Sequence, residues 1–233
     1  MRNGRLWHDP GMLLRGVQFL GWFLYLAGCL LILSNTVADY RPGGFGIFIF
    51  QKGEFGESLV WRTSLYIHIV GGMLCLFAAL PQFSGKLVRR FPGIHRVAGK
   101  VYGASMLFLV SPTGFHLALF AKGGFLGKLG FLTLSVLAFH STIKGWRAVL
   151  PPHRDIAAHR AWMTRSFALV ASAVTFRIYH TLGYMGGLEA DTNYVASLWL
   201  SLIGNMAAAE LLLNRRKIAT FLLPNKPQTQ TEP

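Results

Sequence analysis

Residues 62–83 read RTSLYIHIVGGMLCLFAALPQF, an apolar stretch that holds a single histidine. A helix needs about 20 apolar residues to cross the roughly 30 Å hydrocarbon core of a bilayer, so this stretch is long enough to span a membrane. Further stretches of that length lie at 12–34, 96–121, 126–146, 160–182 and 193–214. We therefore predict an all-α integral membrane bundle of six transmembrane helices, forming a single domain over residues 1–223 with its core at 62–182.

The composition agrees with a membrane protein. The chain has 233 residues, of which 52% are hydrophobic and only 14% charged, too little polar surface for a soluble globule of this size. A net charge of +14 in a soluble protein would suggest nucleic acid binding, but here the basic residues lie in short segments between apolar stretches. We expect the lipid bilayer as the partner and no nucleic acid. Residues 224–233 are polar and contain proline, which predicts a disordered tail.

The basic residues also predict the orientation of the helices. Segments 2–15, 86–100, 144–165 and 215–226 hold 17 of the 23 Lys and Arg residues, and each lies at the same end of the predicted spans. Because loops rich in Lys and Arg stay in the cytoplasm, both termini and the tail are predicted to be cytoplasmic.

Two predicted spans share a pattern of paired histidines. His95 begins the third span and His116 lies near its end, while His159 begins the fifth span and His180 lies near its end. In both spans 21 residues separate the pair, which is about 31 Å along a helix, or one bilayer core. The preceding loops, KLVRRFPGIHR and KGWRAVLPPHRDIAAHR, are also alike. We infer that helices two to five form two pseudo-repeated hairpins.

The histidines fall into two sets by predicted depth. His68 lies with His116 and His180 near the outer face, and His140 lies with His95 and His159 near the inner face. Ionisable residues at membrane depth are rare and usually face the interior of a bundle, so each set predicts a polar site. The alternative is that each histidine is an ordinary residue of a helix end or of the membrane surface.

Haem b is the cofactor that these sites could hold, because a neutral imidazole is a good axial ligand of haem iron. An outer site would take two of His68, His116 and His180, and Arg177 would neutralise a propionate or another anion. An inner site would take His140 with either His95 or His159. The function predicted from such sites is electron transfer or quinone-linked redox chemistry.

Two other classes of function use the same residues. In a small transporter or channel, the histidines, arginines and Glu210 would line a polar path. In a non-catalytic subunit or assembly factor, they would hold the bundle together or contact another membrane protein. The sequence alone leaves all three classes open.

Other polar residues lie inside predicted spans. By helical rise, Arg165 and Glu210 have matching depths, so we predict an ion pair, with a proton relay through Glu210, His140 and His159 as the functional alternative. Asn205 is expected to hydrogen-bond between helices. Pro112 removes a backbone hydrogen bond in the third span, which predicts a break in the helix and a carbonyl that Ser or Thr can satisfy.

The segments HRVAGKVYG (95–103) and HRAWMTRSFAL (159–169), followed by Arg177, resemble a widespread bacterial family of multi-pass membrane proteins classified only as a domain of unknown function. The resemblance covers about residues 65–182 and implies a bacterial inner (cytoplasmic) membrane location, but no activity. The residues that fall on the family pattern are His68, His95-Arg96, His159, Trp162-Met163, Arg165 and Arg177.

Overall fold

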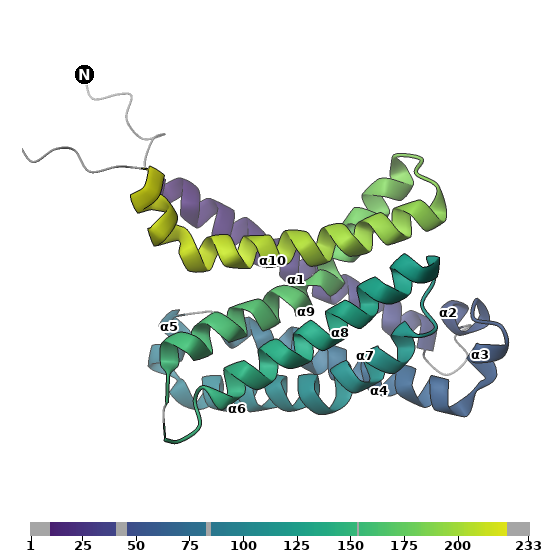
Figure 1. Cartoon of the computed structure of the whole chain (residues 1–233), viewed down its shortest axis with the longest axis horizontal. Helices are drawn as coiled ribbons and strands as arrows, with labels where there is room; N and C mark the ends of the chain where they lie inside the picture. The colour runs from purple at the N-terminus through teal and green to yellow at the C-terminus, as the bar shows by residue number, and fades with distance from the viewer. Residues whose placement is uncertain (1–9, 41–45, 83–84, 153, 223–233) are drawn as a thin grey trace, which may run out of the picture. The chain divides into compact units, whose positions relative to one another are not determined.

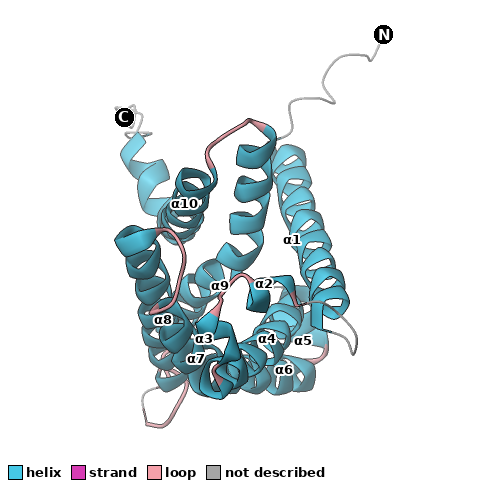
Figure 2. Ribbon diagram, turned by 90° about the vertical axis from the view of Figure 1, so that its right-hand side faces the viewer, coloured by secondary structure: helices cyan, strands magenta, loops and turns pink. Residues whose placement is uncertain are grey.

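The computed structural model describes residues 10–40, 46–82, 85–152 and 154–222. Within these ranges all regular secondary structure is helical (Figure 2). The predicted tail at 224–233 lies outside the described residues. The elements (Figure 1) are α1 (Pro10–Tyr40), α2 (Ile47–Phe50), α3 (Glu54–Glu57), α4 (Leu59–Ala79), the 3-10 helix η1 (Leu80–Gln82), α5 (Gly85–Arg90), α6 (Pro92–Ala104), the π-helix η2 (Ser105–Val110), α7 (Ser111–Ala118), α8 (Gly124–Arg147), α9 (Ile156–Met185) and α10 (Ala190–Leu222).

Five helical segments are long and apolar enough to cross a membrane. Each contains or overlaps a predicted span, and the segments are Phe19–Tyr40, Leu59–Gln82, Pro92–Ala118, Gly124–Arg147 and Ala190–Arg215. The sixth predicted span lies inside α9, which has 30 residues but is not one of the five. The polar residues of α9, among them Arg165 and Arg177, lower its hydropathy. The all-helical membrane fold is thus confirmed, and the sixth span remains a prediction.

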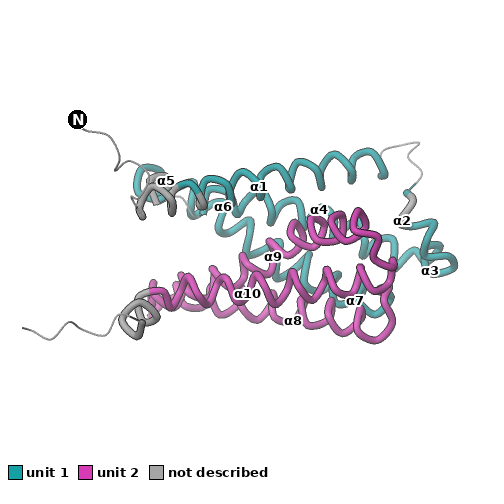
Figure 3. The backbone as a smooth tube through the Cα atoms, turned by 90° about the horizontal axis from the view of Figure 1, so that it is seen from above, with its two compact units in different colours: residues 1–120 teal, residues 121–233 magenta. Residues whose placement is uncertain are grey.

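The chain divides into two compact units, residues 1–120 and 121–233 (Figure 3). Unit 1 contains α1 to α7, and unit 2 contains α8 to α10. In unit 1, α4 contacts α6, η2 and α7, and in unit 2, α8 contacts α9, so both predicted hairpins are packed pairs. The pseudo-repeat between the hairpins and the single domain at 1–223 remain predictions.

Unit 1 is built around α4, which also contacts α1. The Tyr25 hydroxyl of α1 donates a hydrogen bond to the carbonyl oxygen of Leu76 at 3.0 Å. Gly71 lets α4 approach η2 closely, because a Cβ atom at this position would lie 2.7 Å from the Cβ atom of Leu109. Cys29 and Cys75 are both buried and unbridged, so they act as small packing residues.

A π-helical turn, η2, lies directly before Pro112 in the third span. Proline lacks an N–H group and clashes with the carbonyl four residues earlier, which disfavours a regular α-helix at this point. The Thr113 hydroxyl donates to the carbonyl oxygens of Leu109 and Val110, and a ring nitrogen of His68 lies 3.0 Å from the Val110 oxygen. The predicted break is therefore a widened turn whose carbonyls are satisfied by neighbouring side chains.

Unit 2 is a three-helix unit in which α9 contacts both α8 and α10. Small polar side chains lie buried at its contacts. The Thr142 hydroxyl of α8 and the Ser166 hydroxyl of α9 are 2.7 Å apart and both fully buried. Such hydrogen bonds between helices are a usual means of association inside a bilayer, where apolar burial gives little driving force.

Candidate functional site

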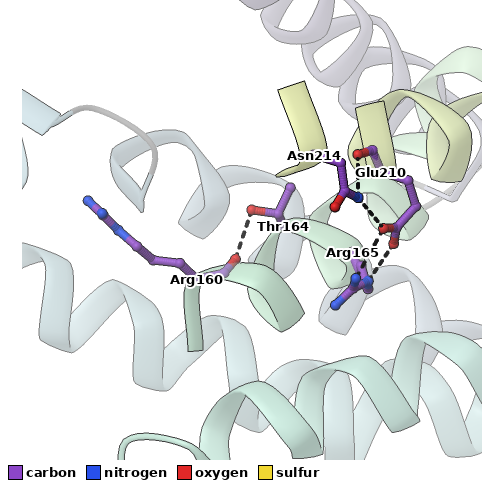
Figure 4. Close-up of polar contacts among 5 residues, drawn as sticks. All are labelled: Arg160, Thr164, Arg165, Glu210 and Asn214. Carbon is purple, nitrogen blue, oxygen red and sulfur yellow. Dashed lines mark hydrogen bonds and ion pairs between the residues drawn. The ribbon is translucent and has the colours of Figure 1, made fainter. Parts of the chain in front are cut away.

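Arg165 of α9 and Glu210 of α10 form an ion pair through two parallel contacts (Figure 4). Arg165 Nε donates to Oε1 at 2.5 Å, and Nη2 donates to Oε2 at 3.1 Å. Asn214 donates its side-chain amide to Oε2 at 3.3 Å, and the guanidinium of Arg165 lies 4.8 Å from the ring centre of Trp162. The Glu210 side chain is 43% exposed within the chain, so the pair lies at the edge of the three-helix unit.

A row of hydrogen-bonding side chains continues from this pair between α9 and α10. We call it the polar seam, and its members are Ser172, Thr175 and His180 of α9 with Asn193, Ser197, Ser201 and Asn205 of α10. Asn205 lies at the end of the row nearest Glu210, and its amide donates to the Ala168 carbonyl at 3.1 Å, to Ser172 Oγ at 3.2 Å and to Thr175 Oγ1 at 3.0 Å. The interhelical role predicted for Asn205 is thereby confirmed.

Three further hydrogen bonds lie along the seam toward the other end of unit 2. Ser172 donates to the Ser201 carbonyl at 3.2 Å, Ser197 donates to Asn193 Oδ1 at 3.2 Å, and Asn193 donates to the His180 carbonyl at 2.9 Å. Asn193, Ser197 and Ser201 are each at most 2% exposed. Buried polar groups on this scale are costly unless they are paired, and here they pair with one another or with the helix backbone.

His180 ends the seam inside an aromatic cluster. Its ring stacks on Phe176 at 5.6 Å and meets the edge of Tyr194 at 6.0 Å. Its Nδ1 atom is buried and has no hydrogen-bond partner among the described residues. Arg177, predicted to serve an anion beside His180, donates to the carbonyl of Ala173 on its own helix at 2.7 Å.

The other two histidines of unit 2 that the structure describes lie at different levels. His159 Nδ1 is 2.7 Å from the Gly145 carbonyl oxygen, and since a carbonyl only accepts, Nδ1 carries the proton. His140 lies five residues from Gly145, about 7.5 Å along α8, with its ring edge on Trp162 at 5.5 Å. A Cβ atom at Gly145 would lie 2.6 Å from the sulfur of Met163, so α8 and α9 are in direct contact here.

In unit 1, His68 and His116 lie on helices that pack against each other. His68 Nδ1 lies 3.0 Å from the Val110 carbonyl oxygen and 3.3 Å from Thr113 Oγ1. His116 lies one turn beyond Thr113, with its ring 5.4 Å from that of Phe120 and its Nδ1 buried without a hydrogen-bond partner in the described chain.

His95, near the start of α6, contacts the 3-10 helix η1 through its backbone. The backbone carbonyl of His95 accepts a hydrogen bond from the Gln82 side chain at 3.2 Å. Among the residues that the structure describes, no three His, Cys, Asp or Glu side chains gather as a metal-binding group. The haem ligands named from the sequence remain a prediction, and the geometry favours them less than it favours the seam.

The seam itself was not predicted, although the sequence contains a signal for it. Asn193, Ser197, Ser201 and Asn205 recur every four residues, so they share one face of a helix. Single serines are common at helix contacts in membranes, and only the regular spacing together with the facing Ser172 and Thr175 distinguishes this set.

The linker before α10 contains a carboxylate cap. Glu189 accepts hydrogen bonds from the backbone N–H groups of Asp191 at 2.9 Å and Thr192 at 2.7 Å. These donors hold the pKa of the Glu189 carboxyl below its usual range, because they stabilise its charged form. The cap therefore starts α10 at the end of unit 2 where the seam reaches His180.

A family model described as "Predicted membrane protein (DUF2306)" matches residues 65–213, more than half of the chain. The chain belongs to the DUF2306 family. The family resemblance noted at 65–182 is confirmed, and the match extends through most of α10 to include Glu210. Comparisons of this DUF2306 protein with curated proteins and with solved structures give no match.

Proposed function

We propose that this DUF2306 protein moves protons across the inner membrane of a bacterium through the polar seam of unit 2, with both termini in the cytoplasm. One observation carries the proposal: buried hydroxyl and amide groups lie between α9 and α10 in the interval from Glu210, an acidic residue, to His180, whose backbone carbonyl accepts the last hydrogen bond of the row. Carboxylates and imidazoles exchange protons, and hydroxyl groups both donate and accept them.

The dimensions of the seam support this assignment. Arg165 and His180 are 15 residues apart on α9, about 22 Å of helix, which covers most of a hydrocarbon core of about 30 Å. The 30 residues of α9 are long enough for a full crossing, and its polar side chains face α10 where they are paired. Glu210 and Asn205 are five residues apart, about 7.5 Å, so water molecules must carry the proton over this step.

Proton flux measured in liposomes tests the proposal. The purified full chain is reconstituted with a pH-sensitive dye inside the vesicles, and a potassium gradient with valinomycin drives protons inward. We expect flux above that of protein-free vesicles, reduced by about 100-fold in Glu210→Gln, a typical loss when a proton-transferring side chain is removed.

Thr164→Val is the matched control. The Thr164 hydroxyl donates to the Arg160 carbonyl of its own helix and lies apart from the ion pair (Figure 4), so this variant should keep the wild-type flux. If Glu210→Gln folds poorly, the pair Arg165→Met with Glu210→Gln removes both charges and should also lack flux. Wild-type flux no higher than that of empty vesicles would reject the proposal.

Haem-based electron transfer, including a quinone-linked form, is a second candidate, and the state of His159 favours it. Its ring holds a backbone carbonyl at Nδ1, which places the lone pair on Nε2, the usual arrangement of metal-binding histidines. A reduced-minus-oxidised absorption spectrum of the purified protein decides this candidate. An α-band that is lost in His159→Phe would support it, and a spectrum without one would exclude it.

A further inference from the structure

The end of unit 2 that carries the Arg165–Glu210 pair presents cations from all three of its helices. The contact of His159 with the Gly145 carbonyl sets these two residues side by side on α9 and α8. Lys144 and Arg160 are the adjacent residues in the chain, so they lie at nearly the same level. The helices α8 and α9 thus each place one exposed cation at this end.

α10 contributes a third cation at this level. The Arg165–Glu210 pair fixes the register of the antiparallel helices α9 and α10. Arg160 lies five residues before Arg165, and Arg215 lies five residues after Glu210, so both lie about 7.5 Å beyond the ion pair in the same direction. Figure 4 shows the Arg160 side chain extending away from the pair. Arg147 and Arg154 add two more exposed cations near the α8 end and the following turn.

Five cations, which we call the basic end, face only one acid that is not already paired: Lys144, Arg147, Arg154, Arg160 and Arg215. Glu210 is paired with Arg165, and the remaining acid is Asp155, which accepts a hydrogen bond from the backbone N–H of Ala158 at the start of α9. Within the described residues, no side chain of the basic end makes an ion pair or hydrogen bond. Arg147 is also the last residue of a segment that is long and apolar enough to cross a membrane, and Arg160 and Arg215 lie near its level, so we place the basic end at the level of lipid headgroups.

We propose that the basic end binds the headgroups of anionic phospholipids such as phosphatidylglycerol. Phosphate oxygens match the Arg donors in charge and geometry, and long Arg and Lys side chains reach headgroups from a helix end. A lipid is favoured over a soluble anion because the cations lie at the ends of membrane spans, where headgroups are held at high local concentration. This inference is independent of the proposed proton path.

The opposite end of unit 2 supplies an internal contrast. Lys122, just before α8, and Lys128 of α8 are exposed there, and two acids, Glu189 and Asp191, lie at the same end at the start of α10. Its charges therefore largely cancel, and it should not select anionic lipid.

A lipid titration tests the proposal. The full chain, held in micelles of an uncharged detergent, is titrated with fluorescent phosphatidylglycerol and, separately, with phosphatidylcholine of the same acyl chains. We expect preferential binding of phosphatidylglycerol. Arg160→Gln should weaken it about fivefold, the fold-change that corresponds to about 1 kcal/mol for one cation near an anionic surface. The triple variant Arg147→Gln, Arg160→Gln, Arg215→Gln should weaken it about 100-fold.

Lys128→Gln is the matched control and should leave the affinity for phosphatidylglycerol unchanged. Size-exclusion profiles and helical circular dichroism confirm that each variant is folded. Equal binding of the two lipids, or full affinity in the triple variant, would overturn the proposal. Soluble glycerol phosphate that competes as well as the lipid at equal concentration would assign the site to a free phosphate and would also overturn it.

Discussion

Glu210 supplies the charged partner of the Arg165 guanidinium. Its carboxylate accepts two hydrogen bonds from Arg165 and one from Asn214. Helical rise was sufficient to predict that Arg165 and Glu210 share a depth, because both helices are regular at this point. The sequence could not show that Trp162 covers the guanidinium or that Asn214 completes the carboxylate, since both depend on the rotation of the helices about their axes.

Glu210→Ala is expected to lower the free energy of unfolding by about 2 kcal/mol, because it leaves the Arg165 guanidinium without its charged partner. Replacing both, as Arg165→Met with Glu210→Leu, should cost less than the single change, since no lone charge remains. Thermal unfolding in detergent gives the comparison, with Thr164→Val as a control within about 0.5 kcal/mol of wild type. A double variant less stable than Glu210→Ala would contradict this role for the pair.

The Glu189 cap predicts a pH-dependent contribution to stability. The folded-state pKa of Glu189 is lowered, so its carboxylate stabilises the folded chain above the unfolded-state pKa of about 4.3. This contribution is lost as the pH falls through the folded-state pKa. Glu189→Gln should therefore unfold at a lower temperature than wild type at pH 7, and the difference should vanish in acid. A difference that stays constant with pH would show that the charge of the cap has no role.

At the scale of elements, the third span shows what proline alone can predict. Pro112 indicated a break and a carbonyl satisfied by a hydroxyl, and Thr113 provides that hydroxyl. The π-helical turn and the contact of His68 with Val110 were not predictable, because they depend on how closely α4 approaches η2. That approach depends on Gly71, and the sequence shows only that this residue is small, not which helix it contacts.

Gly71 and the adjacent Gly72 form a matched pair for testing this approach. Gly71→Ala should destabilise the protein by about 1–3 kcal/mol, because its Cβ atom would lie 2.7 Å from that of Leu109. Gly72→Ala meets nothing within 4 Å and should be neutral or more stable by up to about 1 kcal/mol, because alanine favours the helix. Equal unfolding temperatures for the two variants would contradict the packing described for α4 and η2.

At the scale of the whole molecule, hydropathy and charge predicted an all-helical membrane protein, and five of the six spans agree with helices of sufficient length and apolarity. The sixth is less evident because α9 is the helix with the polar contacts to both α8 and α10. Hydropathy depends on residue type alone, so a buried serine that is hydrogen-bonded counts the same as an exposed one. A membrane-spanning helix whose polar side chains are hydrogen-bonded to neighbouring helices therefore has a low mean hydropathy.

Cysteine labelling tests whether α9 crosses the membrane. Ala157 and Leu188 are exposed and lie near the start of α9 and just beyond its end. In a background without Cys29 and Cys75, a membrane-impermeant maleimide added to intact cells should label Leu188→Cys and not Ala157→Cys. Lysed cells, in which both should react, provide the control, and labelling of both positions in intact cells would place α9 on the membrane surface.

Proton flux through an Asn205 variant tests the central claim most directly. Asn205 orients the hydroxyls of Ser172 and Thr175, and Asn205→Leu removes these hydrogen bonds at similar volume without touching Glu210 or His180. In liposomes driven by a potassium gradient, we predict that wild type and Thr164→Val conduct protons and that folded Asn205→Leu does not. Wild-type flux in Asn205→Leu, or no flux in wild type, would contradict the account.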